Sequence, residues 1–180
     1  MHKSKLGGGK VVQVCYVVED LDAAIDAWVA AIGAGPFFVN KDIHLPVQHR
    51  GQESFFHVGA AHGQAGLLQI ELIQILGKHP SVWTELFPDG GSGTHHIALF
   101  VDDLDQAIAR YTEAGYPLVV RGMVSTVGFA HMDTRASLGF FTELYQESEV
   151  IRSIYFKIAY AARNWDGSNR VRPLADVFPS

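Results

Sequence analysis

Two similar stretches of the chain place side chains that can bind a metal ion at matching positions. The sequence VQVCYVVEDLDAAIDAWVAAIG at 12–33 is similar to THHIALFVDDLDQAIARYTEAG at 94–115, with Gln13 matched to His96. Two later apolar stretches, LQIELIQI and FFTELY, each carry one glutamate. An imidazole, an amide oxygen and two carboxylates suit Zn, Ni, Co, Mn or Fe better than a structural zinc site. The predicted ligands of a divalent metal ion are Gln13, Glu71, His96 and Glu143.

The alternation of side chains along predicted strands directs these four residues toward one space. Gln13 shares a strand face with Cys15 and Val17, opposite a face that is wholly apolar. Glu143 shares a face with Tyr145, while the other face of that strand is again mostly apolar. If the sheets of the two repeats join, the four candidate ligands point into one cavity. Four ligands also leave room for a substrate or water, as a catalytic metal site requires.

Each repeat reads as a βαβββ module. In the first, Asp20 is placed to cap a helix, and Gly33 is placed to end it. The predicted fold class is α+β, with two paired βαβββ modules forming a curved mixed sheet with a cleft, followed by a C-terminal helix. A polar stretch at 41–53 is expected to be a loop. The predicted divisions are a flexible N-terminus at 1–10, the first module at 11–88, the second at 89–147, and a C-terminal helix and tail at 148–180.

The composition is that of a globular protein of one domain, or of two small repeats that share a core. Of the 180 residues 48% are hydrophobic and 18% charged. A net charge of -5 argues against nucleic acid as a partner, and no apolar run approaches the roughly 20 residues that span a bilayer. The only cysteine, Cys15, fits a reducing compartment, and the N-terminus lacks the apolar segment of a secretory signal. We expect a soluble, cytoplasmic protein with no membrane partner.

The chain resembles the vicinal oxygen chelate superfamily, which includes glyoxalase I, methylmalonyl-CoA epimerase, extradiol dioxygenases and bleomycin-resistance proteins. The resemblance covers about 11–145 and is carried by VVQVCYVVEDLDAAI, GLLQIELIQIL, GTHHIALFVDDLDQAI and GFFTELY. In this family βαβββ modules pair to form a cleft, and their end strands supply the metal ligands. The resemblance places first-strand ligands at Gln13 and His96 and last-strand ligands at Glu71 and Glu143. That set is similar to glyoxalase I of the animal type.

The resemblance implies proton transfer next to a substrate carbonyl. A metal ion that holds a carbonyl oxygen and an adjacent oxygen stabilises an enediolate. Glu143 resembles the carboxylate that acts as the base in glyoxalase I, while Glu71 is a second base or a plain ligand. We therefore expect a metal-dependent isomerase, epimerase or glyoxalase-type lyase that acts on a small organic substrate with a carbonyl. A homodimer is expected.

Further residues are predicted from the sequence to line the cleft. The predicted substrate contacts are His57, His131, Phe100, Phe141 and Arg50. Three other histidines, His44, His49 and His62, are expected to be solvated loop residues, and His95 is expected to face the helices or the solvent.

Two other functions stay open. A bleomycin-resistance type of protein would bind a small molecule in a similar cleft without a metal ion, although it has no need for two acids in an apolar sheet. A ring-cleaving dioxygenase needs two histidines and one glutamate, so Gln13 counts against it.

Overall fold

The computed structural model describes Leu6 and residues 9–178; most of the N-terminal segment predicted to be flexible lies outside the described residues. The strands are β1 (Val11–Val18), β2 (Phe37–His49), β3 (Gln52–Ala65), β4 (Leu68–Ile75), β5 (Gly93–Val101), β6 (Leu118–Val124), β7 (Val127–Met132), β8 (Phe141–Gln146) and β9 (Val171–Pro173). The helices are α1 (Leu21–Ile32), α2 (Val82–Leu86), α3 (Leu104–Glu113), α4 (Arg135–Leu138), α5 (Glu149–Ala162) and the 3-10 helix η1 (Leu174–Val177).

The two predicted βαβββ modules are confirmed. The first runs β1-α1-β2-β3-β4 and the second runs β5-α3-β6-β7-β8. In each module the first and last strands are parallel neighbours, and the remaining strands add in antiparallel hairpins. The fold is therefore α+β, with one mixed sheet built from a repeated unit.

The sheet curves until it closes on itself. Antiparallel pairing of β1 with β5 joins the modules on one side, and antiparallel pairing of β2 with β6 joins them on the other. Since β2 also pairs with β3, eight strands form a complete ring, and β9 pairs with the first residues of β2, along the edge whose far end pairs with β6. The cleft expected from the sequence is consequently the interior of a barrel, where a cavity of about 530 Å³ lies.

The helices of the two modules pack on the outer face of the sheet, as the sequence repeat predicts. The side chain of Asp20 accepts a hydrogen bond from the backbone N–H of Ala23 and begins α1. Gly33 ends the helix in the left-handed conformation, at φ 70°. Leu21 and Ile25 of α1 are buried against the outer side of the sheet. This packing leaves the other face of the strands free to line the interior.

The prediction of a loop at 41–53 is wrong, because this segment belongs to a long hairpin formed by β2 and β3. The two strands pair from Phe38 to His49, and the turn lies at Arg50–Gly51. Ile43, Leu45 and Val47 alternate with polar or exposed residues, which is the pattern of a strand buried on one face only. Because the exposed face is polar, this segment resembles a loop when only its sequence is considered.

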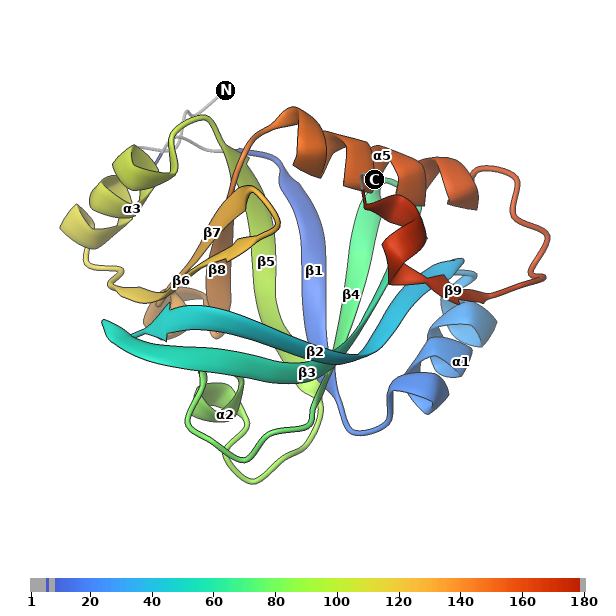
Figure 1. The fold of residues 1–180 in the computed structure, drawn as a ribbon, viewed down its shortest axis with the longest axis horizontal. Helices are drawn as coiled ribbons and strands as arrows, with labels where there is room; N and C mark the ends of the chain where they lie inside the picture. The colour runs from blue at the N-terminus through green and yellow to red at the C-terminus, as the bar shows by residue number, and fades with distance from the viewer. Residues whose placement is uncertain (1–5, 7–8, 179–180) are drawn as a thin grey trace.

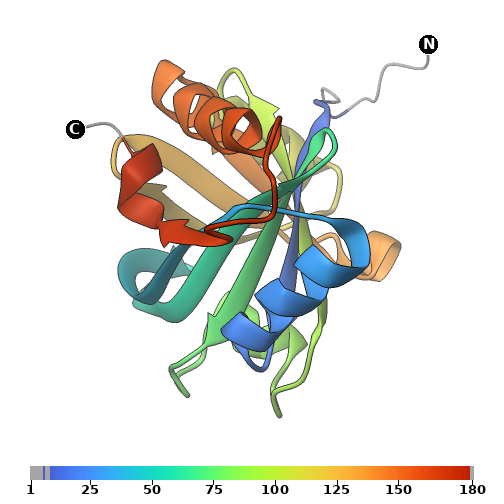
Figure 2. The same ribbon diagram turned by 90° about the vertical axis from the view of Figure 1, so that its right-hand side faces the viewer.

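The C-terminal segment covers one end of the barrel. In Figure 1, α5 runs across the upper ends of β1, β4 and β5, and Figure 2 shows β9 and η1 on the same side of the molecule. Ile154 and Ile158 of α5 pack with Leu174 and Val177 of η1 and with Phe38 of β2. Within the described residues, no helix is long and apolar enough to cross a membrane.

Candidate metal centre

The strand register relates the predicted ligands by an approximate twofold axis. Along β1 and β5, Gln13 lies opposite Ala98 and Cys15 lies opposite His96, so Gln13 and His96 occupy equivalent places. Glu71 lies beside Cys15, and Glu143 lies beside Ala98, the residue equivalent to Cys15. All four predicted ligands are buried and line the cavity.

A third equivalent pair of residues, His62 and His131, joins the same cluster. His62 lies opposite Glu71 on β3, and His131 lies opposite Glu143 on β7. The prediction that His62 lies in a solvated loop is wrong, because β3 continues to Ala65. A sequence signal for it exists: Phe56, Val58 and Ala60 alternate with polar or small residues, and His62 continues that face.

The imidazole of His96 lies between the two carboxylates. Its Nε2 atom is 3.3 Å from Glu71 Oε2 and 3.0 Å from Glu143 Oε2. None of these three buried atoms has a hydrogen bond of acceptable geometry to any described residue. The three atoms therefore converge on a shared space without pairing as donor and acceptor.

The neighbouring His95 orients His96. The backbone carbonyl of Val82 can only accept, so His95 Nε2, at 3.2 Å, carries the proton between them. His95 is fully buried, and burial, followed by the charge of His96, holds its pKa well below the ordinary value. Neutral His95 therefore accepts at Nδ1 from His96 Nδ1, 2.9 Å away. This hydrogen bond orients the His96 ring so that its Nε2 atom points toward the carboxylates of Glu71 and Glu143.

The electrostatics around His96 require a positive charge. Burial alone would lower the pKa of His96, but the carboxylates of Glu143 and Glu71 raise it to about 9. Burial acts to raise the pKa of Glu71, yet its interactions with the imidazoles of His62 and His96 hold it well below the ordinary value. Burial raises the pKa of Glu143, and the opposing charge of His96 does not offset it.

The donor set fits a divalent cation. Two buried carboxylates beside an imidazole nitrogen are costly without a partner of opposite charge. A proton on His96 supplies one positive charge, and a metal ion that replaces it would satisfy all three unpaired atoms. His96, His131 and Glu143 also offer ligand atoms within 4.8 Å of one another. The first-module amide of Gln13 adds a buried Oε1 atom that has no partner among the described residues.

A known family accounts for most of the chain. The glyoxalase/bleomycin resistance protein/dioxygenase superfamily matches residues 12–134. The chain belongs to this superfamily. Its members typically use a divalent metal ion, in agreement with the donor set described above. No curated protein sequence matches the chain.

Solved structures with the same fold include methylmalonyl-CoA epimerases. The epimerase from Mycobacterium tuberculosis is 21% identical, with a TM-score of 0.56, over 80% of this chain and 91% of that one. A variant of the Streptomyces coelicolor epimerase in complex with 2-nitronate-propionyl-CoA is 19% identical, with a TM-score of 0.54, over 76% and 96%. A hypothetical protein from Bacillus halodurans C-125 is 18% identical, with a TM-score of 0.56, over 79% and 96%.

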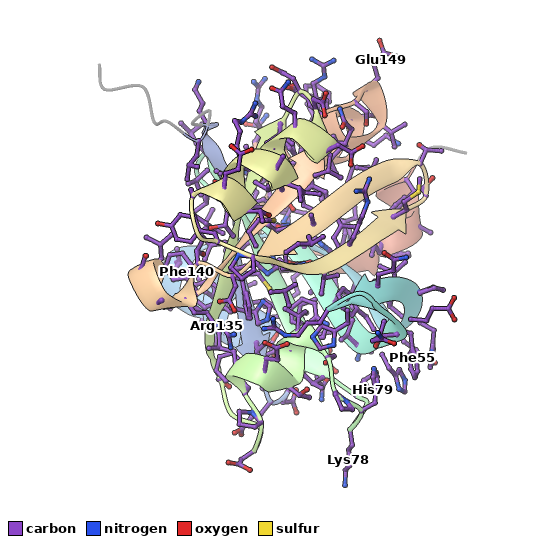
Figure 3. The ribbon with its side chains drawn as sticks, turned by 90° about the vertical axis from the view of Figure 1, so that its left-hand side faces the viewer. Phe55, Lys78, His79, Arg135, Phe140 and Glu149 are labelled. Atoms are coloured by element: carbon purple, nitrogen blue, oxygen red, sulfur yellow. The ribbon has the colours of Figure 1, made fainter. Side chains whose placement is uncertain are left out.

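Two of the substrate contacts predicted for this superfamily member lie on the outside of the barrel. His57 is on the opposite face of β3 from His62, and its ring stacks on His44 at 4.0 Å. Phe55 shares that outer face, and Figure 3 shows it beside His79. Arg50, in the hairpin turn, pairs with Glu85 at 2.7 Å. His57 and Arg50 therefore do not line the cavity.

The side chains of Phe100 and Phe141, both predicted to contact substrate, face the inside of the barrel but do not line the cavity. Phe141 is buried beneath Arg135, whose guanidinium carbon is 4.5 Å from the ring centroid. Phe100 packs against the ring of Tyr155 at 4.9 Å. Neither is among the residues that line the cavity, whereas His131 is. His95, expected to face helices or solvent, is buried against Val82 and Trp83 of α2 and also contacts His96.

Proposed function

We propose that the protein is a metal-dependent enzyme that moves a proton next to a substrate carbonyl. The reaction classes are isomerisation, epimerisation and glyoxalase-type lyase chemistry. The observation that carries the proposal is the convergence of His96 Nε2, Glu71 Oε2 and Glu143 Oε2 without mutual hydrogen bonds. The epimerases that share the fold agree with this class of reaction, at low sequence identity.

The residues that would hold the metal ion are His96, Glu143, Glu71 and Gln13. A divalent cation held there would stabilise the negative charge that develops on a carbonyl oxygen when a neighbouring proton leaves. His95 keeps the His96 ring oriented through the contact between their Nδ1 atoms.

The two glutamates have different surroundings, which favour Glu143 as the base. Glu71 Oε1 lies 3.0 Å from His62 Nε2, and this hydrogen bond restrains the carboxylate. Glu143 Oε1 is 3.8 Å from His131 Nε2, too far for such a hydrogen bond, and the Glu143 carboxylate interacts with the hydroxyl of Tyr145 instead. Burial raises the pKa of Glu143, whereas His62 and His96 hold that of Glu71 down. Glu143 is therefore the better proton acceptor of the two and is placed to take the proton from carbon and to return it.

The walls of the cavity protect this transfer from bulk water. Phe56, Ile73 and Phe129 line the space around the cluster and are themselves buried. An apolar wall strengthens the interaction between a charged base and a polarised substrate, because the local dielectric is low. It also slows the exchange of the transferred proton with solvent.

Metal analysis combined with proton exchange tests the proposal. We expect one equivalent of divalent metal ion per chain in the purified protein, and metal-dependent exchange of the α-proton of small α-hydroxyketones in D₂O. Elemental analysis and proton NMR measure the two quantities. A protein free of metal in every preparation, even after incubation with Zn²⁺, Ni²⁺, Co²⁺, Mn²⁺ or Fe²⁺, would instead be a small-molecule binding protein.

A second candidate function is favoured by His131. Together with His96 and Glu143 it forms a cluster of two histidines and one carboxylate, a ligand set that suits iron(II) oxygenases. Gln13 counts against an iron(II) oxygenase only if its own side chain is a metal ligand. Oxygen consumption by the iron(II)-loaded protein with a catechol would support an oxygenase, and its absence together with α-proton exchange would exclude one.

The expectations of a homodimer and of a cytoplasmic location stay predictions. Light scattering of the purified protein would establish the oligomeric state.

A further inference from the structure

The cavity beside the metal centre is large and mainly apolar. Its volume of about 530 Å³ is far larger than a single metal ion needs and is typical of sites for small organic molecules. The apolar walls include Ile43, Leu45, Phe56, Val58, Ile73 and Phe129. Among the described residues, no lysine or arginine lines this space.

Two hydrogen-bond donors in this apolar wall lack partners. Trp83 is 4% exposed, and its indole Nε1 has no hydrogen-bond partner within residues 9–178. The buried hydroxyl of Tyr155 likewise has no hydrogen-bond partner among the described residues. Both residues line the cavity. A buried donor without a partner is unfavourable, so both groups are placed to donate to an acceptor on a bound molecule.

Tyr155 comes from α5, which lies beyond residues 12–134 that match the superfamily. Figure 3 places Glu149, at the start of α5, on the end of the molecule opposite Lys78. Ile151 and Ile154 of the same helix and Leu174 of η1 also line the cavity. The C-terminal segment therefore builds one wall of the site.

Cations near this wall are engaged elsewhere. Lys157 donates to the backbone oxygens of Val177 and Phe178, at 3.2 and 3.4 Å. The guanidinium of Arg172 lies over the ring of Phe38, 5.8 Å from its centroid. A coenzyme A ester carries phosphates, which proteins bind chiefly with lysine, arginine and helix N-termini. The wall built by α5 and η1 offers only apolar groups and one hydroxyl.

We propose that the cavity binds a compact, uncharged organic molecule with acceptor oxygens, that Trp83 and Tyr155 donate to those oxygens, and that coenzyme A esters are excluded. The inference deepens the proposed function, and it rests on that function only for the position of the reacting carbonyl. Tyr155 is thus a residue that determines specificity, supplied by a segment outside the region that matches the superfamily.

Calorimetric titration of the purified protein tests this substrate class. The test molecules are 2-hydroxyacetophenone, which is compact and has two adjacent oxygens, ethylbenzene, which lacks oxygens, and methylmalonyl-CoA. We expect 2-hydroxyacetophenone to bind and methylmalonyl-CoA not to bind. The Tyr155→Phe variant, which removes one hydroxyl, should bind 2-hydroxyacetophenone roughly three- to tenfold more weakly. Its affinity for ethylbenzene should not change, because ethylbenzene accepts no hydrogen bond.

A matched control lies on the same helix. Tyr160 is 64% exposed, so Tyr160→Phe should leave both affinities at the wild-type value. Trp83→Phe removes the other donor and should also weaken binding of 2-hydroxyacetophenone. Binding of methylmalonyl-CoA as tightly as 2-hydroxyacetophenone, equal binding by wild type and Tyr155→Phe, or no binding of 2-hydroxyacetophenone would overturn the inference.

The same titrations, repeated after a chelator has removed the metal ion, show whether the affinity differences depend on the metal. Together with the proton-exchange assay, they separate this inference from the proposed function. If the protein lacks metal-dependent proton exchange but still shows the affinity differences, the proposed function fails and the inference stands. If proton exchange occurs but coenzyme A esters bind, the inference fails and the proposed function stands.

Discussion

The two modules supply equivalent residues to the cavity, but their halves of the cluster differ in how these residues are paired. In the first module, Gln13 Nε2 donates to Gln69 Oε1 at 2.6 Å, and His62 contacts Glu71 at 3.0 Å. In the second, neither nitrogen of His131 has a hydrogen-bond partner among the described residues. The first half therefore pairs part of its polar groups with one another, although Gln13 Oε1 and Glu71 Oε2 stay without partners, whereas His131 of the second half has no partner at either nitrogen.

One substitution between the repeats explains much of this difference. The register places Gln69 beside Gln13 on the first module and Phe141 beside His96 on the second. A phenylalanine cannot accept a hydrogen bond, so His96 turns to His95 instead and leaves its Nε2 atom free. A symmetrical scaffold thus gives an asymmetric site, and the reactive groups are expected on the second module.

The largest expected effect is a difference between the two glutamates. Glu143→Gln should lower the rate of α-proton exchange by about 10²- to 10⁴-fold, since it removes the base. Glu71→Gln should mainly weaken metal binding and leave the rate of the metal-saturated enzyme closer to wild type. Proton NMR in D₂O at saturating metal ion measures both rates.

Full exchange activity in the metal-saturated Glu143→Gln variant would remove Glu143 as the base. If Glu71→Gln then lost the activity, the roles of the two modules would be reversed.

The support of His96 by His95 gives a smaller effect. His95→Phe keeps an aromatic ring beside Trp83 but removes the nitrogen that accepts from His96. Loss of such an orienting contact typically lowers metal affinity by about 10- to 100-fold. Competition with a chromophoric chelator measures the affinity. His57→Phe, on the outside of the barrel, is the control and should bind metal like wild type; equal affinity of both variants would contradict the role of His95.

Gln13 should contribute less to metal binding than His96. Its amide is already hydrogen-bonded to Gln69, and only its oxygen is free. Gln13→Ala is expected to weaken metal binding by no more than about tenfold, the size of a single neutral hydrogen-bonding contact. The same chelator competition, with His96→Ala beside it, ranks the two. A greater loss of metal affinity in Gln13→Ala than in His96→Ala would place the metal ion in the first module.

The smallest effect concerns the ion pairs that link the two modules outside the cavity. Burial acts to raise the pKa of Glu85, but hydrogen bonds from Arg50 and His49 hold it below the ordinary value. Arg135 of the second module also reaches Glu85, at 3.2 Å. Because the folded pKa is lower than the unfolded one, this carboxylate stabilises the fold above about pH 4.3, and the contribution disappears as the pH falls through the folded pKa.

Glu85→Gln should therefore cost about 1 kcal/mol of unfolding free energy at pH 7 and almost nothing near pH 3. Urea unfolding at both pH values measures the difference. Glu113→Gln, at an exposed position of α3, is the control and should be neutral at both. A cost for Glu85→Gln that does not change with pH would contradict a role based on charge.

The repeated strand-turn-helix could be predicted from the sequence because its local patterns agree with one another. Asp20 and Asp103 cap equivalent helices, and the period of the strands separates a helix-packed face from an inner face. The positions of Gln13, His96 and the glutamates in the cavity follow from that period.

Other features depend on contacts that no local pattern reveals. Closure of the barrel requires pairing between β2 and β6, which lie about 70 residues apart in the chain. The second half of β2, predicted as a loop, is held in the hairpin by its pairing with β3, and its outward-facing residues are polar because that face is exposed to solvent. Phe100 and Phe141 have the predicted orientation, but the sequence does not give their depth along the barrel.

A crystal structure of the protein equilibrated with Mn²⁺, with anomalous scattering collected, tests the central claim most directly. We predict an anomalous peak within coordination distance of His96 Nε2 and Glu143, inside the barrel. A second cluster, Asp42, His44 and His57, lies on the outer surface and serves as an internal comparison. An anomalous peak at that surface cluster alone, with His96 Nε2 still facing only the two carboxylates, would contradict a metal centre in the cavity.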